Sequence, residues 1–557
     1  MKLIDIYCEN SGVAKAYEPG TSLMQIAQDQ SIRLESPILA ALANNLLKEL
    51  WYEVSGPQTI RFIGYSHPDG KRCYQRSLTF LLQKAVKDAF PECSLSVEHS
   101  VSNGFYCELK GTSGFSASMV GGIAKRMREL VAADLPFEKK KVQTSEAIAI
   151  FRGQGYVEKA RLQQTRGKLY TSVYYLSGYA DHFYGPLVPS TGALSSFGLT
   201  PYYNGMLLMF PKAGSSGALE HVVAQKKMFD IFREHKQWVE ILQAGAVGQI
   251  NELIQRNGGD ELIKVSEALH EKKYAQIADH ISSRGGEVKL ALVAGPSSSG
   301  KTTTSKRLSI QLKVAGFSPK VLEMDSYFVN RDQTPLDEHG ERDFESIGAV
   351  DLPLFNDHLD QLLRGRRVQL PKFDFGSGTR SRSGEHMELG EKDILIVEGI
   401  HALNPKLTEA VSLKRKLRIY ASALTFINLD ENNRISTTDN RLVRRLVRDA
   451  FFRGSGAQAT LHRWASVRRG EEKNIFPFQE HADIMFNSSL LYEINVLRRY
   501  AEPMLYRVLP NDSAYVEACR LLKFLSYFEF VSPEDERKVP PTSVIREFIG
   551  GSSFSYC

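Results

Sequence analysis

One stretch near the middle of this 557-residue chain limits most strongly what it can fold into. Residues 291–308 read ALVAGPSSSGKTTTSKRL, which fits the phosphate-binding pattern G-x-x-x-x-G-K-[ST]. The apolar run before the pattern suits a buried parallel strand, and the spacing after it is helical. Glycines let the backbone bend closely around a phosphate, so that N–H groups and the helix N-terminus point at the anion. Pattern and context together favour a strand–loop–helix nucleotide site over a chance Gly/Ser-rich turn.

The residues of this loop have distinct expected roles. Lys301 is expected to reach the β- and γ-phosphates, and the Thr302 hydroxyl to face Mg²⁺. The expected cofactors are therefore ATP, or GTP, and Mg²⁺. The nucleotide-binding residues that we predict are Gly295, Ser298, Ser299, Gly300, Lys301, Thr302, Thr303, Arg448 and Arg453.

The chain is too long for one core, and its composition changes along its length. We expect a small α+β module over residues 1–68, a mixed α+β region over 69–215, a helical connector over 216–286, a strand–helix domain over 287–510 and a C-terminal extension over 511–557. Alternating strand and helix signals in the fourth part predict an α/β fold with a doubly wound parallel sheet. We assign no chemistry to the C-terminal extension.

Composition narrows the functional class only slightly. A hydrophobic content of 42% and a charged content of 24% are ordinary for globular protein, and a net charge of +6 does not by itself call for nucleic acid. The six cysteines show no C-x-x-C spacing, which argues against a zinc ribbon or a disulfide framework and for a reducing compartment. No apolar run is long enough for a membrane span. We expect a cytoplasmic protein that contacts no membrane and forms a homo-oligomer.

Two carboxylates follow apolar strands in the predicted α/β domain. KVLEMDSYF reads as a strand that leads to Asp325, and DILIVEGIHALNP as a strand that delivers Glu398. Ligands of parallel sheets bind beyond the carboxyl ends of the strands. Asp325 could therefore take a proton from an acceptor hydroxyl, and Glu398 is suited to bind Mg²⁺. The alternatives are a turn aspartate and a solvent-exposed strand-end glutamate.

Four arginines lie on one face of the predicted helix NRLVRRLVRDAFFRG. They are Arg441, Arg444, Arg445 and Arg448. Like charges at this spacing repel by roughly 0.2 to 0.5 kcal/mol per pair on an exposed helix. A polyphosphate against the face would make it favourable, because arginine binds phosphate in a bidentate manner. The alternative is a solvated basic face.

Several motifs together resemble one family of kinases. GPSSSGKTTTS, MDSYF, DFESIGAVD, KFDFGSGTR, LIVEGI and RRLVRD followed by FRG occur in the order of the uridine kinase and phosphoribulokinase group, over about residues 287–510. The resemblance implies catalytic roles for Asp325, Lys301 and Arg448, with Asp325 as the general base. It implies that Thr302, Asp325 and Glu398 surround Mg²⁺, and that Arg445, Arg448 and Arg453 come from a lid over the phosphates. The substrate-binding residues that it implies are Phe344, Glu345, Phe373, Phe375, Arg380 and Arg445.

The acceptor segment departs from that family's pattern in several places. Glu345 stands where the family has a ribose-binding aspartate, and the three phenylalanines could equally be core residues. Gly378 occupies the place of a base-reading histidine, Ser455 replaces an arginine, and Arg463 replaces a glutamine that helps hold the pyrimidine. Losing these groups weakens the case for uridine or cytidine. We expect Gly378 to leave space for a larger base, which makes a purine nucleoside such as adenosine a candidate.

The front of the chain resembles a different family. YEPGTSLMQIA is similar to the small TGS module, and residues 69–215 resemble the editing domain of threonyl-tRNA synthetases. The resemblance implies a His/His/Cys/His site, but Arg76, Phe80, Phe183 and Leu187 stand at those four places. We expect a scaffold without hydrolytic editing that could still contact RNA. His182 is expected to be a surface or hydrogen-bonded histidine, because one imidazole makes no metal site.

Two hypotheses from different classes follow. The first is an ATP- and Mg²⁺-dependent kinase that phosphorylates the 5′-hydroxyl of a nucleoside, with transfer to a sugar phosphate as a variant. The second is a nucleotide-regulated protein that binds tRNA or the ribosome. The set of Lys301, Thr302, Asp325, Glu398 and Arg448 favours the kinase, because a switch needs no base on the acceptor side.

Overall fold

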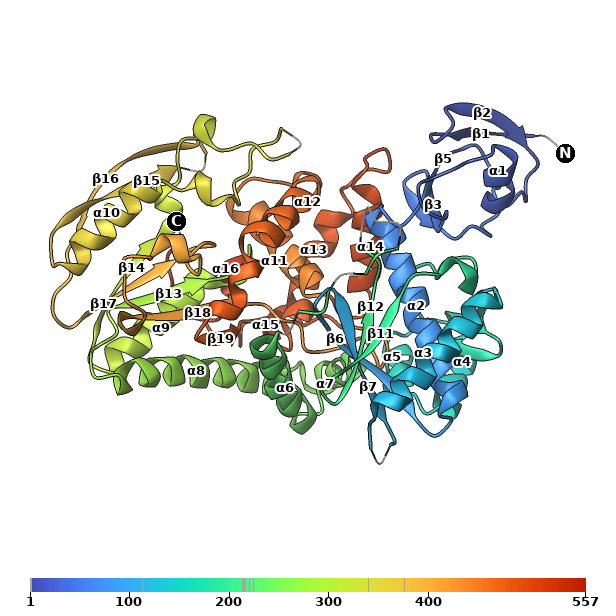
Figure 1. Cartoon of the computed structure of the whole chain (residues 1–557), viewed down its shortest axis with the longest axis horizontal. Helices are drawn as coiled ribbons and strands as arrows, with labels where there is room; N and C mark the ends of the chain where they lie inside the picture. The colour runs from blue at the N-terminus through green and yellow to red at the C-terminus, as the bar shows by residue number, and fades with distance from the viewer. Residues whose placement is uncertain are drawn as a thin grey trace.

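The computed structural model describes residues 3–112, 114–212, 217–219, 221–223, 225–338, 340–374 and 376–556. Figure 1 shows the N-terminal module at one end of an elongated molecule and the hairpin of β15 (Val368–Asp374) and β16 (Thr379–Met387) at the other. No helix in these described ranges is long and apolar enough to cross a membrane.

The N-terminal module is a small mixed sheet with one helix. Its strands are β1 (Ile4–Cys8), β2 (Val13–Tyr17), β3 (Ala40–Ala43), β4 (Leu46–Lys48) and β5 (Gln58–Ile63), in the order β2-β1-β5-β3-β4. The helix α1 (Leu23–Asp29) begins with a capping box, in which Ser22 and Gln25 satisfy each other's backbone N–H groups.

The second region contains two antiparallel sheets and four helices. The helices are α2 (Pro68–Ala89), α3 (Ala117–Ala132), α4 (Thr144–Gly153) and α5 (Val157–Thr165). One sheet has the order β11-β12-β7-β6, from β6 (Ser94–Val101), β7 (Gly104–Lys110), β11 (Gly198–Tyr202) and β12 (Gly205–Met209). The other has the order β10-β9-β8, from β8 (Glu138–Gln143), β9 (Tyr170–Leu176) and β10 (Tyr179–Asp181). Three further helices, α6 (Lys226–Ile241), α7 (Val247–Asn257) and α8 (Asp260–Ser283), run from this region to the next (Figure 1).

The third region is built on a parallel sheet. Its order is β14-β17-β13-β18-β19, from β13 (Leu290–Ala294), β14 (Ser318–Glu323), β17 (Asp393–Glu398), β18 (Lys416–Ser422) and β19 (Ile484–Asn487). Every pairing is parallel, and the central strands β13 and β17 are buried along their whole length. The predicted α/β class with a doubly wound parallel sheet is confirmed, and α+β modules precede it.

The helices of this region and the C-terminal extension complete the fold. They are α9 (Lys301–Val314), α10 (Leu352–Leu363), α11 (Thr437–Phe452), α12 (Ala457–Asn474), α13 (Glu493–Leu505), α14 (Tyr515–Leu525), α15 (Pro533–Glu536) and α16 (Arg546–Ile549). The hairpin of β15 (Val368–Asp374) and β16 (Thr379–Met387) projects from the sheet (Figure 1). The short helix α16 returns to pack against α11, so the chain ends beside the parallel sheet.

Candidate active site

The phosphate-binding loop joins β13 to α9 at the carboxyl edge of the parallel sheet. Gly295 is required for space, because an added Cβ would lie 1.9 Å from the carbonyl oxygen of Ala421. Ser298 and Gly300 have left-handed backbones, with φ of 58° and 79°. The buried Ser298 hydroxyl has no hydrogen-bond partner among the described residues. Curved backbone and unsatisfied polar groups suit the loop to an anion.

The two predicted carboxylates lie at the same sheet edge as this loop. Asp325 sits in a 3-10 turn directly after β14, and Glu398 is the last residue of β17. Glu398 is only 6% exposed, which excludes the solvent-exposed alternative. The pKa of Glu398 is raised to about 8, chiefly by burial. The nearby charge of Asp325 also raises the pKa of Glu398. The two carboxylates are thus close enough to interact electrostatically.

The groups around Glu398 fit a magnesium ion. One carboxylate oxygen of Glu398 accepts a hydrogen bond from the Thr302 hydroxyl at 3.0 Å, and the other has no partner in the described part of the chain. Mg²⁺ is usually held by one or two carboxylates together with substrate phosphates, so Thr302, Asp325 and Glu398 are a suitable donor set. No cluster of three or more His, Cys, Asp or Glu side chains placed to hold a metal occurs within the described ranges.

The first arginine of α11 supports the loop from behind. Arg441 is 1% exposed and pairs with the buried carboxylate of Glu471 at 2.8 Å. Its guanidinium also donates to the carbonyl oxygen of Ser297 at 3.1 Å, while Glu471 accepts from the Ser297 N–H at 3.0 Å. Arg441 and Glu471 therefore fix the loop backbone.

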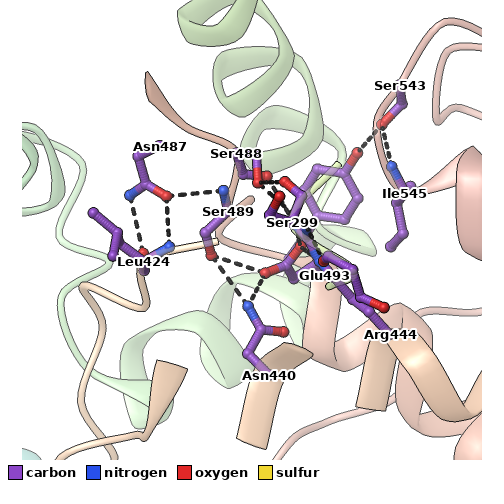
Figure 2. Close-up of polar contacts among 12 residues, drawn as sticks. Ser299, Leu424, Asn440, Arg444, Asn487, Ser488, Ser489, Glu493, Ser543 and Ile545 are labelled. Atoms are coloured by element: carbon purple, nitrogen blue, oxygen red, sulfur yellow. Dashed lines mark hydrogen bonds and ion pairs between the residues drawn. The ribbon is translucent and has the colours of Figure 1, made fainter. Parts of the chain in front are cut away.

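The second arginine does the same at the next loop residue. Arg444 is fully buried, pairs with Glu493, and donates to the carbonyl oxygens of Ser488 at 2.8 Å and Ser298 at 3.4 Å. Figure 2 shows Arg444 and Glu493 within a polar network that also contains Ser299 and Ser488. For Arg441 and Arg444, the predictions of a solvated face and of direct contact with phosphate are both wrong. Each guanidinium instead pairs with a buried carboxylate and donates to carbonyl oxygens of the loop.

Three further arginines of the predicted site, Arg445, Arg448 and Arg453, lie close to one another. Arg445 donates to the Ser297 hydroxyl at 2.8 Å and pairs with Asp449 at 3.2 Å, and Arg448 pairs with the same Asp449 at 2.8 Å. Burial and the neighbouring Arg448 lower the pKa of Arg453 to about 10. Arg445 and Arg448 thus share the Asp449 carboxylate beside the phosphate-binding loop. A polyphosphate beside these arginines would add favourable charge-assisted hydrogen bonds.

On the acceptor side, Glu345 is held against α12. An added Cβ at Gly470 would lie 2.4 Å from the Cβ of Glu345, so only glycine fits there. One carboxylate oxygen of Glu345 is buried without a hydrogen-bond partner among the described residues. Burial raises the pKa of this carboxyl to about 7, and Glu471 raises it too, whereas Arg445 and Lys301 lower it. Glu345 therefore has one buried acceptor oxygen near the positive charges of Arg445 and Lys301.

The other predicted substrate-binding residues are placed as follows. Phe344 is 45% exposed, which does not fit the alternative of core packing. Phe373 packs edge-on against Phe328 with ring centroids 5.7 Å apart, and Phe375 lies outside the described residues. Arg380 pairs with Asp351 at 2.8 Å.

The structure corrects our expectation for Gly378. This residue has φ of 73°, and an added Cβ would lie 2.6 Å from the Nε of Arg331. The guanidinium of Arg331 fills the space that we expected a larger base to use. Glycine is favoured here by the backbone conformation and by Arg331, and no motif predicts that this arginine approaches Gly378.

The four positions of the editing-like site are filled differently from a metal site. Phe80, Phe183 and Leu187 are buried in one core, and the rings of Phe80 and Phe183 lie 5.4 Å apart. Arg76 donates to the carbonyl oxygen of Pro186 at 3.1 and 2.9 Å. An aromatic core thus occupies most of the place where the resemblance implies metal ligands.

His182, next to that core, is a structural residue. Its side chain is buried, and its ring nitrogens lie 2.8 Å from the carbonyl oxygen of Ser172 and 2.8 Å from the hydroxyl of Tyr527. The hydrogen-bonded interpretation was correct and the surface one was wrong. The contact with Tyr527 also ties the second region to the C-terminal extension.

Sequence reasoning missed the C-terminal contact with the loop. The N–H and the hydroxyl of Thr303 donate to the Glu547 carboxylate at 3.3 and 2.6 Å, and the Tyr556 hydroxyl lies 3.0 Å from the Thr303 hydroxyl. No motif marks these residues, and only their position in space brings them to the loop.

A parallel sheet with a phosphate-binding loop and two carboxylates at its carboxyl edge, beside the arginine-rich helix α11, defines a P-loop kinase. Residues 291–494 match the model of the phosphoribulokinase / uridine kinase family. A uridine kinase from Bacillus pumilus is 32% identical over 194 residues, which cover 35% of this chain and 83% of that protein. The chain belongs to the phosphoribulokinase and uridine kinase family.

The N-terminal region has a different relative. A threonine–tRNA ligase from Desulforamulus reducens is 26% identical over 189 residues, which are 34% of this chain. The matched part spans only 30% of the length of that ligase.

Among solved structures, a D-glycerate 3-kinase from Cryptococcus neoformans is 16% identical, with 46% of this chain and 87% of that one covered and a TM-score of 0.23.

Proposed function

We propose that this kinase transfers the γ-phosphate of ATP to the 5′-hydroxyl of a nucleoside. The observation that carries the proposal is Glu345, a half-buried residue with one buried carboxylate oxygen that no described residue satisfies, near Lys301 and Asp325. A buried acceptor is costly unless a donor reaches it, and the hydroxyls of a ribose are such donors. A switch that only bound nucleotide would not need this group.

The residues divide the reaction between them. Asp325 accepts the proton of the attacking hydroxyl, and Lys301 with Arg445, Arg448 and Arg453 binds the charge of the transferred group. Bound by Thr302, Asp325 and Glu398, Mg²⁺ would neutralise phosphate charge and orient the phosphates. Catalysis here is mostly positioning and electrostatics, so buried supports such as Arg441 and Arg444 contribute indirectly.

The proposal also covers the base of the nucleoside and a role for the N-terminal half of the chain. We propose that Arg331, which fills the space beside Gly378, contacts the base, because a guanidinium donates to ring nitrogens and carbonyl oxygens. Adenosine therefore stays a candidate beside uridine. RNA contact through the N-terminal half is the second candidate function, supported by the similarity to threonine–tRNA ligase.

A radiolabelled transfer screen tests the proposal. The protein is given ATP and Mg²⁺ with uridine, cytidine, adenosine, guanosine, inosine or ribulose 5-phosphate. Label in one nucleoside, lost in Asp325→Asn, is the expected result. Label only in ribulose 5-phosphate would mean that the acceptor is a sugar phosphate and not a nucleoside. No transfer at all would favour the nucleotide-regulated RNA-binding alternative.

A further inference from the structure

The C-terminal segment from Ser543 to Tyr556 lies directly on the phosphate-binding loop. The Val544 side chain approaches Gly300 so closely that an added Cβ would lie 2.4 Å from it. Beyond it, Glu547 of α16 accepts hydrogen bonds from the N–H and the hydroxyl of Thr303, at 3.3 and 2.6 Å. The Tyr556 hydroxyl reaches the same threonine hydroxyl at 3.0 Å.

Thr303 occupies a special place in α9. It is the third residue of the helix, and the first four N–H groups of a helix have no acceptor within the helix. Together with the positive end of the helix dipole, such groups bind phosphate in loops of this kind. The Glu547 carboxylate is an anion on one of them. The same N–H group cannot serve both Glu547 and a nucleotide phosphate at full strength.

The base of the segment is anchored independently of Glu547. The Ser543 hydroxyl hydrogen-bonds to the buried Glu267. The Ile545 N–H donates to the Ser543 hydroxyl at 3.4 Å, as Figure 2 shows. Phe548 is buried in the core, and its ring lies 5.0 Å from the guanidinium of Arg444, which itself holds the loop. Glu547, in contrast, is only partly buried. Its carboxylate can move off Thr303 while the anchors stay in place.

We propose that Glu547 and Tyr556 belong to the donor-nucleotide site, and that the Glu547 carboxylate holds a phosphate position until a nucleotide displaces it. The inference rests on the proposed function only in requiring that the loop binds a nucleotide. Nucleotide affinity is then set partly by the C-terminal segment. Exchange of one anion for another makes the segment an internal competitor of ATP.

Equilibrium titration of the full-length protein with ATP and Mg²⁺ tests the proposal. Glu547→Gln keeps a side-chain oxygen for the Thr303 N–H but removes the competing charge. We expect ATP to bind roughly tenfold more tightly, equivalent to about 1.4 kcal/mol. Adenosine, which has no phosphate, should bind with unchanged affinity. Glu534→Gln, an exposed change in the same extension, should leave both affinities at wild-type values.

Each other outcome overturns the proposal in a recognisable way. Equal or weaker ATP binding by Glu547→Gln, with phosphate transfer intact, would refute it and leave the proposed function standing. No ATP binding and no transfer by any of these proteins would refute both. If Glu547→Gln does not fold, Glu547→Ala replaces it, because it also removes the competing carboxylate, and a Kd for ATP equal to or above the wild-type value would count against the proposal.

Discussion

The kinase region and the synthetase-like region use their buried positions differently. In the kinase region, Glu345 and Glu398 each have one buried carboxylate oxygen that no described residue satisfies. In the synthetase-like region, the places that the resemblance assigns to metal ligands hold Phe80, Phe183 and Leu187 in a continuous core. A buried polar atom without a hydrogen-bond partner lowers stability, and it is retained where a ligand supplies that partner. A closed aromatic core contributes to stability but offers a ligand no polar group.

The comparison predicts which region carries chemistry. Asp325→Asn removes the acceptor of the hydroxyl proton, so we expect kcat for phosphate transfer to fall by about 10² to 10⁴-fold. Transfer of label from ATP measures it. Arg76→Gln in the synthetase-like region is the control and should leave kcat unchanged. A kcat for Asp325→Asn above one tenth of wild type would contradict the assignment.

The second prediction concerns the support of the loop. Arg444→Leu leaves Glu493 buried without its partner, so we expect a loss of about 3 to 5 kcal/mol in the free energy of unfolding. Urea denaturation measures this loss. Arg463→Leu, an exposed arginine on α12, should change stability by less than about 0.5 kcal/mol.

The double variant Arg444→Leu/Glu493→Leu sharpens the second prediction. It removes both charges and should regain part of the loss. Stability of the double variant below that of Arg444→Leu would show that the pair is not the source of the effect.

The third prediction uses the raised pKa of Glu345. Because its pKa is about 7 in the folded protein and near 4.5 when unfolded, the folded state binds this proton more tightly. The stabilisation that comes from this bound proton is thus present at pH 4.5 and is lost as the pH rises through 7. Glu345→Gln should therefore be more stable than wild type at pH 8 by on the order of 1 to 3 kcal/mol, and equal to it at pH 4.5.

Thermal unfolding at both pH values measures this difference. The same variant should raise KM for the nucleoside, because the amide accepts a ribose hydroxyl less well. If Glu345→Gln is more stable at pH 8 but has an unchanged KM for the nucleoside, Glu345 does not bind the acceptor.

The smallest effect is expected at Arg331. Arg331→Ala removes the guanidinium beside Gly378 and should change the ratio of kcat/KM between purine and pyrimidine nucleosides by roughly tenfold. Competition between labelled nucleosides measures the ratio. An unchanged ratio, with kcat/KM lowered equally for all nucleosides, would make Arg331 a structural residue.

How far sequence reasoning reached differs from residue to residue. The loop from Gly295 to Thr302 and the strand-end residue Glu398 could be placed because strand, loop and helix are adjacent in the sequence. The roles of Arg441 and Arg444 could not, because their partners Glu471 and Glu493 come from other helices. The expected space at Gly378 was wrong for the same reason, since Arg331 approaches from a separate turn.

The sequence by itself determined the parallel sheet, the phosphate-binding loop and the family, because these depend on local patterns of apolar, glycine and hydroxyl residues. Only the tertiary structure decided which charged groups face a ligand and which neutralise one another. It also brought Glu547, distant in the chain, onto Thr303. Electrostatic interactions depend on distance in space and on burial, and neither can be read from the spacing of residues along a chain.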